Sequence, residues 1–183
     1  ILVVDNGSTD KTIQLSRDCG ARVLDSSGSI AYSRNYGAQE ARSDILVFLD
    51  ADVELTEEWG RAILETMDLI DSEPDCVTGA WYKVRKDGSA LERYWFGPLE
   101  SGPHSHINAG NLLLARKKFL DLGGFDEGMV TGEDYEFTRR AMRLGCSIRE
   151  NEQLAVIHHG YPTGLGEFLR REVWHGLGDY GSL

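Results

Sequence analysis

The sequence is short of basic residues, of cysteine and of long apolar runs. Its 19 lysines and arginines face 30 aspartates and glutamates, which gives a formal net charge of -11. A field of that sign disfavours nucleic acid and anionic membrane surfaces, so we expect neither as the main partner. If the ligand is a phosphate, a divalent cation held by carboxylates would offset the charge.

The three cysteines, Cys19, Cys76 and Cys146, lack the spacing of metal ligands, and an odd number gives no closed disulfide framework. A reducing, cytoplasmic compartment is therefore expected. No apolar run approaches the length of a transmembrane helix. The 183 residues suffice for one ordinary core, so we predict a single domain over residues 1–183.

One apolar run, residues 45–49, ends abruptly at two carboxylates, Asp50 and Asp52. A short run rich in Val, Ile and Phe indicates a strand buried on both faces, as in a parallel sheet. Ligands of such sheets bind at the carboxyl ends of the strands. The two acids are one residue apart, so an extended backbone directs both to the same side, where they could share one hard cation. The alternative is a strand-to-helix turn in which Asp52 or Thr56 caps the next helix.

Strand and helix signals alternate over the first third of the chain. Strands are predicted at residues 1–4, 21–24 and 45–49, and helices at about 8–19, 29–42 and 56–70. This alternation predicts an α/β fold with a mostly parallel, Rossmann-like sheet flanked by helices.

After Pro74 the pattern changes. The β-rich segments 76–85 and 90–96 surround Lys86-Asp87-Gly88, which predicts a hairpin and a smaller antiparallel region. Residues 97–105 predict a loop over a site. Later signals predict strands at 107–115 and 154–157, and helices at 116–122, from Gly132 to Leu144, and at the end of the chain.

Four polar clusters end predicted strands or open a predicted helix. They are Asp5-Asn6, Asp50 with Asp52, Glu133-Asp134 and His158-His159. Each has an ordinary structural explanation when taken alone, but together they indicate one site on one α/β frame.

Three stretches resemble, in order and spacing, the family-two glycosyltransferases of GT-A fold: VVDNGSTD, SRNYGAQEARSDILVFLDADVEL and NAGNLLLARKKFLDLGGFDEGMVTGEDYEFTRRAMRLG. The resemblance covers residue 1 to about residue 160. It implies transfer of a sugar, with inversion, from a nucleotide-sugar donor to a carbohydrate or lipid-linked acceptor, with Mg²⁺ or Mn²⁺ as cofactor. It also implies that residues 1–72 bind the nucleotide sugar and that residues 73–183 bind the acceptor and carry the catalytic groups.

For the donor, the resemblance implies that Asp5 and Asn6 contact the base and ribose, with Arg34 as a donor-side basic residue. Asp50, the first acid of the family's DxD motif, would lie near the ribose. Many relatives have a second acid where this chain has Asn6. Beside Gly110, Asn111 is a candidate hydrogen-bond group for the sugar.

For the metal and the chemistry, the resemblance implies that Asp52 is the direct metal ligand and that Asp134 is the general base. Its neighbour Glu133 would orient the acceptor or raise the proton affinity of Asp134. A histidine after the last strand would complete the metal shell. Alternation sends His158 and His159 to opposite sides, and we prefer His158 because it continues the inward phase of Val156.

The sequence also departs from the family. Processive synthases carry a Gln-x-x-Arg-Trp motif, of which the stretch at 170–174 keeps only the Trp, so we predict a non-processive enzyme in polysaccharide or glycolipid synthesis, in the cytoplasm or at the inner face of the membrane. The family's first strand and helix, normally ahead of Ile1, are absent, and we expect a fragment of a longer protein.

Two other functions stay open. Asp50-Ala51-Asp52 superficially matches the nucleophile loop of haloacid-dehalogenase-type phosphohydrolases, but two predicted strand–helix units precede it, which counts against that class. The other is a non-catalytic nucleotide-sugar-binding module.

Overall fold

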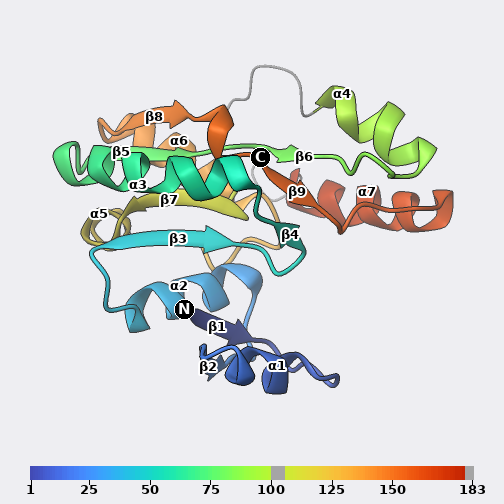
Figure 1. Ribbon diagram of the computed structural model, residues 1–183, viewed down its shortest axis with the longest axis horizontal. Coiled ribbons are helices and arrows are strands. Elements are labelled where there is room, and N and C mark those ends of the chain that lie inside the picture. The colour runs from blue at the N-terminus through green and yellow to red at the C-terminus, as the bar shows by residue number, and fades with distance from the viewer. Residues whose placement is uncertain (100–105, 180–183) are drawn as a thin grey trace.

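The computed structural model describes residues 1–99 and 106–179 (Figure 1). Its strands are β1 (Leu2–Asp5), β2 (Arg22–Asp25), β3 (Ile45–Leu49), β4 (Val53–Glu54), β5 (Cys76–Gly79), β6 (Tyr82–Lys83), β7 (Asn111–Ala115), β8 (Ser147–Glu150) and β9 (Val156–His158). Its α-helices are α1 (Thr12–Asp18), α2 (Ile30–Glu40), α3 (Glu57–Ser72), α4 (Gly97–Leu99), α5 (Arg116–Asp121), α6 (Glu133–Arg143) and α7 (Leu165–Asp179). Two further turns are the π-helical η1 (Glu92–Phe96) and the 3₁₀-helical η2 (Glu152–Leu154).

The strands form a four-stranded sheet in the order β3-β7-β5-β8, a β1-β2 pair and a β4-β9-β6 group. Strands and helices thus form the predicted α/β class. The sheets are mixed rather than mostly parallel, because β7 runs antiparallel to both β3 and β5. The amide of Asp50 donates to the carbonyl of Gly110 over 3.1 Å, so β7 begins where β3 ends and has to run back along it.

The central strand β7 contributes side chains to two hydrophobic cores. Its Leu112 and Leu114 pack with residues of α2, α5 and α6, whereas Leu113 packs with residues of α3 on the other face. This is the side-chain alternation of a strand covered on both sides. On the first face four phenylalanine rings pack with centroids 5.0 to 5.5 Å apart. They are Phe48, Phe119, Phe125 and Phe137.

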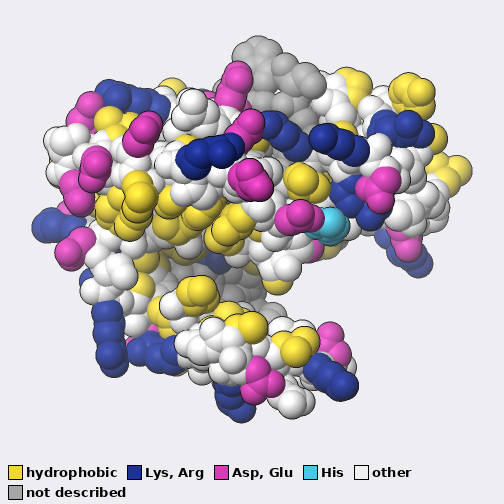
Figure 2. Space-filling view, viewed as in Figure 1, with side chains coloured by type: hydrophobic (Ala, Val, Ile, Leu, Met, Phe, Trp, Pro, Cys, Tyr) yellow, Lys and Arg dark blue, Asp and Glu magenta, His cyan; other side chains and the backbone are white. Residues whose placement is uncertain are grey.

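A smaller lobe holds β1, α1 and β2. Figure 2 shows the molecular face hollowed between this lobe and the body that carries the four-stranded sheet. Helix α2 lies against both parts, since it packs on β1 and also contacts α5. Residues on α2 are therefore held between the lobe and the end of β3.

The structure corrects the predicted hairpin around Lys86-Asp87-Gly88. The residues after Gly88 form helical turns, including η1 and α4, instead of a strand. Glu92 explains the difference, because its fully buried carboxylate accepts hydrogen bonds from the backbone of Ser89 and from Arg85. Satisfying that charge overrides the β preference of the aromatic residues around it.

Other helices and strands also differ from the predicted ones. Helix α1 starts at Thr12 rather than near Ser8, because the Ser8 amide donates to the carboxylate of Asp5 and the Thr12 amide to that of Asp10. Two strands, β4 and β8, were not predicted. Of the expected loop at 97–105, residues 100–105 lie outside the described part of the chain. Within the described residues, no helix combines the length and apolar character that crossing a membrane requires.

Candidate functional site

Arg34 joins three elements at the end of β3. It lies on α2, whose first turn is capped by the Ser29 hydroxyl. Its guanidinium donates to Asp50 and to Glu133, each over 2.5 Å, and only 13% of its side chain is exposed. Burial works against the charge, but the two acids more than compensate and raise the pKa of Arg34.

Two acids open helix α6. The turn before them is made by Gly132 at φ 81°, a left-handed conformation that suits glycine. Glu133 is buried; burial, followed by repulsion from Asp134, raises its pKa despite the opposing charge of Arg34. Asp134 is half-buried and accepts a hydrogen bond of 3.2 Å from the backbone of Ala109, so its carboxylate faces the loop before β7.

Asp52 and His158 meet across the pairing of β4 with β9, in which Val53 is opposite His158. The imidazole Nε2 lies 3.4 Å from the Asp52 carboxylate, and the hydrogen bond from His158 lowers the pKa of Asp52. His159 points elsewhere and lies 2.9 Å from Glu54. The structure therefore places the imidazole of His158, and not that of His159, beside the Asp52 carboxylate.

The Asp52–His158 pair offers two donor groups of different kinds. Over residues 1–99 and 106–179, no three His, Cys, Asp or Glu side chains are grouped closely enough to hold a metal by themselves. The Nδ1 atom of His158 is buried and has no hydrogen-bond partner. One carboxylate and one imidazole fit a divalent cation whose remaining ligands come from substrate phosphates and water.

Two residues that sequence reasoning missed connect these groups. The Tyr82 hydroxyl lies 3.0 Å from Asp50 Oδ2 and 2.6 Å from Asn108 Oδ1, and the Tyr82 ring stacks on His158. Asn108 stands in the quoted stretch that begins Asn-Ala-Gly-Asn, as a polar residue just before a buried strand. Nothing in the sequence around Tyr82 singles it out.

The predicted donor residues Asp5, Asn6 and Asn111 lie outside this cluster. The Asp5 carboxylate accepts from the backbone of Gly7 and Ser8, and its bonds with Ser8 lower its pKa. Asn6 is exposed and donates to a carbonyl 22 residues away, that of Gly28.

Asn111 is wholly buried in the core. Its amide donates to the carbonyls of Ala80 and Leu154, and its oxygen accepts from the indole of Trp59. With every polar group of the side chain bonded inside the protein, the geometry makes Asn111 a core bridge and does not favour the predicted sugar contact.

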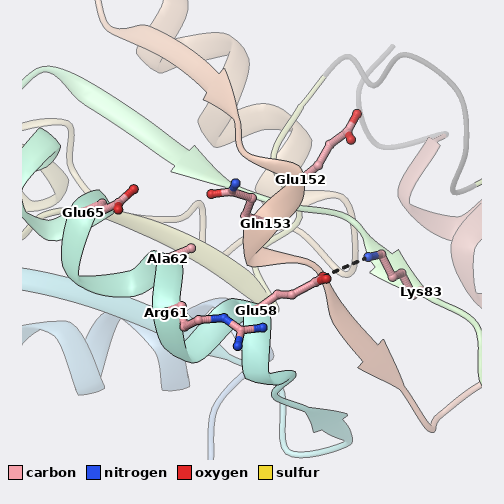
Figure 3. A pocket seen from close by; sticks show the side chains of 7 residues that line it. All are labelled: Glu58, Arg61, Ala62, Glu65, Lys83, Glu152 and Gln153. Atoms are coloured by element: carbon pink, nitrogen blue, oxygen red, sulfur yellow. Dashed lines mark ion pairs between the residues drawn. The ribbon is translucent and has the colours of Figure 1, made fainter.

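A separate pocket lies between α3, β6 and η2 (Figure 3). Charged side chains dominate its lining, and Glu58 and Lys83 form an ion pair of 4.0 Å across it. None of the predicted site residues lines this pocket. We therefore do not assign the site to it.

The fold defines a class. Two solved structures share it: GalNAc-T7 with UDP, GalNAc and Mn²⁺, and the mannosyltransferase PcManGT of Pyrobaculum calidifontis with GDP-Man and Mn²⁺. They align with TM-scores of 0.67 and 0.69 over 93% and 99% of this chain, and over 40% and 53% of theirs, at 17% and 15% identity. The chain therefore has the GT-A fold of glycosyltransferases.

The sequence defines the family. The model of glycosyl transferase family 2 matches residues 1–126, and the chain belongs to that family. Among curated relatives, the pre-mycofactocin glycosyltransferase of Mycobacterium tuberculosis is 26% identical over 96% of this chain, and the glycosyltransferase AglE of Haloferax volcanii is 28% identical over 97%. The chain spans 40% and 62% of those two proteins.

Proposed function

We propose that this chain carries the transfer site of an inverting, nucleotide-sugar-dependent glycosyltransferase. The observation that carries the proposal is the convergence of Asp50, Glu133 and Asp134 on one arginine, Arg34, beside the Asp52–His158 pair. These residues come from α2, from the segment between β3 and β4, from the end of β9 and from the start of α6. Family membership and the GT-A fold support the same chemistry.

The charge balance of the cluster favours a cation. Three carboxylates face the single charge of Arg34, and Asp52 adds a fourth. Asp52 and His158 would hold Mg²⁺ or Mn²⁺, as the Mn²⁺ in the two similar solved structures suggests. When bound, such an ion neutralises negative charge on a departing diphosphate. We propose a nucleoside diphosphate sugar as the donor, which the UDP and GDP-Man of those structures also suggest.

Asp134 is the proposed general base. The acceptor hydroxyl loses its proton as its oxygen attacks the anomeric carbon, and a carboxylate next to the acceptor takes that proton. Asp134 is half-buried and hydrogen-bonded to Ala109, while its neighbour Glu133 is held by Arg34. Arg34 thus stabilises Glu133 and Asp50, the two acids beside the base. In this proposal Asp50 lies next to the donor.

The site uses both predicted parts of the chain, because Arg34 and Asp50 come from residues 1–72 and the acids of α6 come from residues 73–183. We assign the donor to the first part and a carbohydrate or lipid-linked acceptor to the second. Asp5 and Asn6 remain proposed contacts of the base and ribose. Non-processive polysaccharide or glycolipid synthesis, in the cytoplasm or at the membrane's inner face, stays a prediction.

The first experiment identifies the donor. Thermal unfolding is followed with a panel of nucleotide sugars, each with and without Mn²⁺. A stabilisation that requires both Mn²⁺ and one nucleoside diphosphate sugar is expected. If no member of the panel shifts the transition, the chain has no donor site and the proposal fails.

The second experiment tests the base. Asp134→Asn keeps the size of the side chain and an oxygen for the Ala109 amide. We expect the rate of transfer to fall about 10²–10⁴-fold, while Mn²⁺-dependent nucleotide binding is retained. Glu136→Gln, on the same helix and paired with Arg140, is the matched control. Unchanged transfer in Asp134→Asn would refute the assignment, and binding without any transfer by the wild-type chain would indicate a non-catalytic module.

A further inference from the structure

Tyr82 lies between two groups of the proposed site, the Asp50 carboxylate and the His158 imidazole. It lies on β6, is 7% exposed, and sends its hydroxyl to the end of β3. There the hydroxyl oxygen is 3.0 Å from Asp50 Oδ2 and 2.6 Å from Asn108 Oδ1. A phenol has one proton to donate, so it can serve only one of these two oxygens at a time.

Asn108 is itself fixed. Its Oδ1 accepts a 2.9 Å hydrogen bond from the Gly110 amide. That bond defines which end of the amide faces Tyr82, so the tyrosine hydroxyl meets two acceptors and no donor. If a ligand engages the Asp50 carboxylate, the phenol O–H can turn and donate to Asn108 Oδ1 instead, so that no buried hydroxyl is left unpaired.

The ring of Tyr82 performs a second task. It stacks on the imidazole of His158 at a centroid distance of 4.6 Å and an interplanar angle of 7°. Tyr161 packs edge-on against the same imidazole at 4.3 Å. The pairing of β6 with β9, in which Tyr82 is opposite Val156, sets this arrangement in the backbone.

That packing matters because the imidazole lacks the usual second anchor. Histidines that bind metal ordinarily donate their other ring N–H to a carboxylate, a carbonyl or water, which fixes the ring. Here Nδ1 of His158 is buried without a partner. The orientation of Nε2 toward Asp52 then rests on the flanking rings, of which Tyr82 is the parallel one.

Gly110 keeps the space for this contact. A Cβ at residue 110 would lie 1.9 Å from the Tyr82 hydroxyl and 2.3 Å from Asp50 Oδ2. Neither atom is the loose end of a solvent-exposed side chain, so any larger residue would separate the two groups. The close approach of Tyr82 to Asp50 therefore depends on this glycine.

We propose that Tyr82 is a positioning residue that couples Asp50, through its hydroxyl, to His158, through its ring. This inference rests on the proposed function, in which Asp50 serves the donor and His158 the metal. The roles of the hydroxyl and of the ring can therefore be separated by mutation. The hydroxyl serves donor binding, and the ring serves metal binding.

Tyr82→Phe isolates the hydroxyl. It keeps the stacked ring and removes the bond to a carboxylate, so the Kd for the nucleotide sugar and the donor KM should rise about tenfold. The change in kcat should be much smaller. The Kd for Mn²⁺ alone, measured by electron paramagnetic resonance of free Mn²⁺, should stay at the wild-type value. Tyr94→Phe removes a hydroxyl from a tyrosine that is 78% exposed and is the matched control.

Tyr82→Leu removes the ring as well. The Kd for Mn²⁺ alone should rise about 10-fold or more, as when a second partner of a metal-binding histidine is lost, and should approach that of His158→Ala. Thermal unfolding and circular dichroism establish that the variant is folded. If Tyr82→Leu does not fold, Tyr82→Met, which retains bulk without a flat ring, replaces it.

The outcomes separate the two proposals. Wild-type donor affinity in Tyr82→Phe overturns the role proposed for the hydroxyl. Wild-type Mn²⁺ affinity in a folded variant without the ring overturns the role proposed for the ring. In either case, transfer by the wild type still supports the proposed function. If the wild type binds Mn²⁺ but transfers no sugar, the proposed function is wrong, and the Kd for Mn²⁺ alone decides the role proposed for the ring. A wild type that binds neither Mn²⁺ nor a nucleoside diphosphate overturns both.

Discussion

Arg85 with Glu92 and Arg34 with Glu133 are both arginine–glutamate pairs with a buried carboxylate. Glu92 is 0% exposed and Glu133 is 5% exposed. Yet the pKa of Glu92 is lowered, chiefly by its hydrogen bonds from Arg85, whereas burial raises the pKa of Glu133. Burial acts to raise both pKa values, and only at Glu92 do the hydrogen bonds outweigh it.

The two regions also differ in how many acids share one arginine. Glu92 takes two bonds from Arg85, of 3.1 and 3.2 Å, and a third of 2.6 Å from the backbone of Ser89. Glu133 takes one bond from Arg34, which also serves Asp50. A closed pair of the first kind stabilises a local structure. The second region keeps surplus negative charge, which is the electrostatic character expected where a cation and a proton-accepting group are required.

The largest expected difference in stability comes from deleting each glutamate. Glu92→Ala removes three hydrogen bonds to a buried carboxylate and leaves the Ser89 amide without its partner, so the free energy of unfolding should fall by about 2–3 kcal/mol. Glu133→Ala removes one bond and relieves repulsion on Asp134, so the loss should be about 1 kcal/mol. Urea unfolding of both variants measures the difference.

Glu73→Ala serves as the control for that comparison. Glu73 forms an exposed ion pair with Arg149, and its removal should cost less than about 1 kcal/mol. Sugar transfer should fall in Glu133→Ala and stay at the wild-type level in Glu73→Ala. Equal destabilisation by Glu92→Ala and Glu133→Ala would show that the two regions do not differ in the way described.

Local sequence signals predicted the parts of the site that depend on neighbouring residues. The apolar run at 45–49 matches β3 at both ends, because its boundaries are set by the change from apolar to charged residues. The alternation argument that preferred His158 agrees with the geometry, since Val156 is buried and His158 lies beside Asp52. Such signals act within one strand and need no knowledge of the remaining fold.

The long-range contacts were not predictable in the same way. Arg34 and Glu133 are 99 residues apart, and Asn35 bonds to the backbone of Phe125 over 90 residues. Tyr82 reaches its partners only because β6 pairs with β9, and β6 has just two residues. The segment 90–96 was mispredicted because one buried charge, Glu92, outweighed the β preference of its neighbours.

Two glycines that flank α6 share a left-handed backbone conformation, and replacing either should have a smaller effect on stability. Gly132, before the acids of α6, has φ 81°, and Gly145, after the same helix, has φ 90°. Alanine at either position should cost about 1–2 kcal/mol of unfolding free energy, because a Cβ strains a left-handed residue. Neither added Cβ meets a close contact, since the nearest atom at Gly132 is 3.8 Å away and none lies within 4 Å at Gly145.

Their consequences for function should differ. Gly132→Ala should also reduce sugar transfer, because it shifts the start of α6 where Glu133 and Asp134 lie. Gly145→Ala is the matched control and should retain wild-type transfer at a similar loss of stability. Equal transfer by the two variants would separate the geometry of this turn from the chemistry of the site.

The smallest effects concern pH, and their signs distinguish the two pairs. The pKa of Glu92 is lowered in the folded state, so this group stabilises the fold above its unfolded pKa and loses that contribution as pH falls through its folded pKa. The raised pKa of Glu133 acts in reverse: its contribution is fully present below the unfolded pKa and is lost as pH rises through the folded pKa.

Glutamine at each position removes the titration and keeps the shape of the side chain. From about pH 3.5 to pH 7.5, the unfolding free energy of Glu92→Gln should fall relative to wild type, and that of Glu133→Gln should rise relative to wild type. Urea unfolding at several pH values measures both differences. Parallel slopes for the two variants would contradict the contrast between them, because burial and repulsion from Asp134 outweigh Arg34 at Glu133, whereas the hydrogen bonds from Arg85 and Ser89 outweigh burial at Glu92.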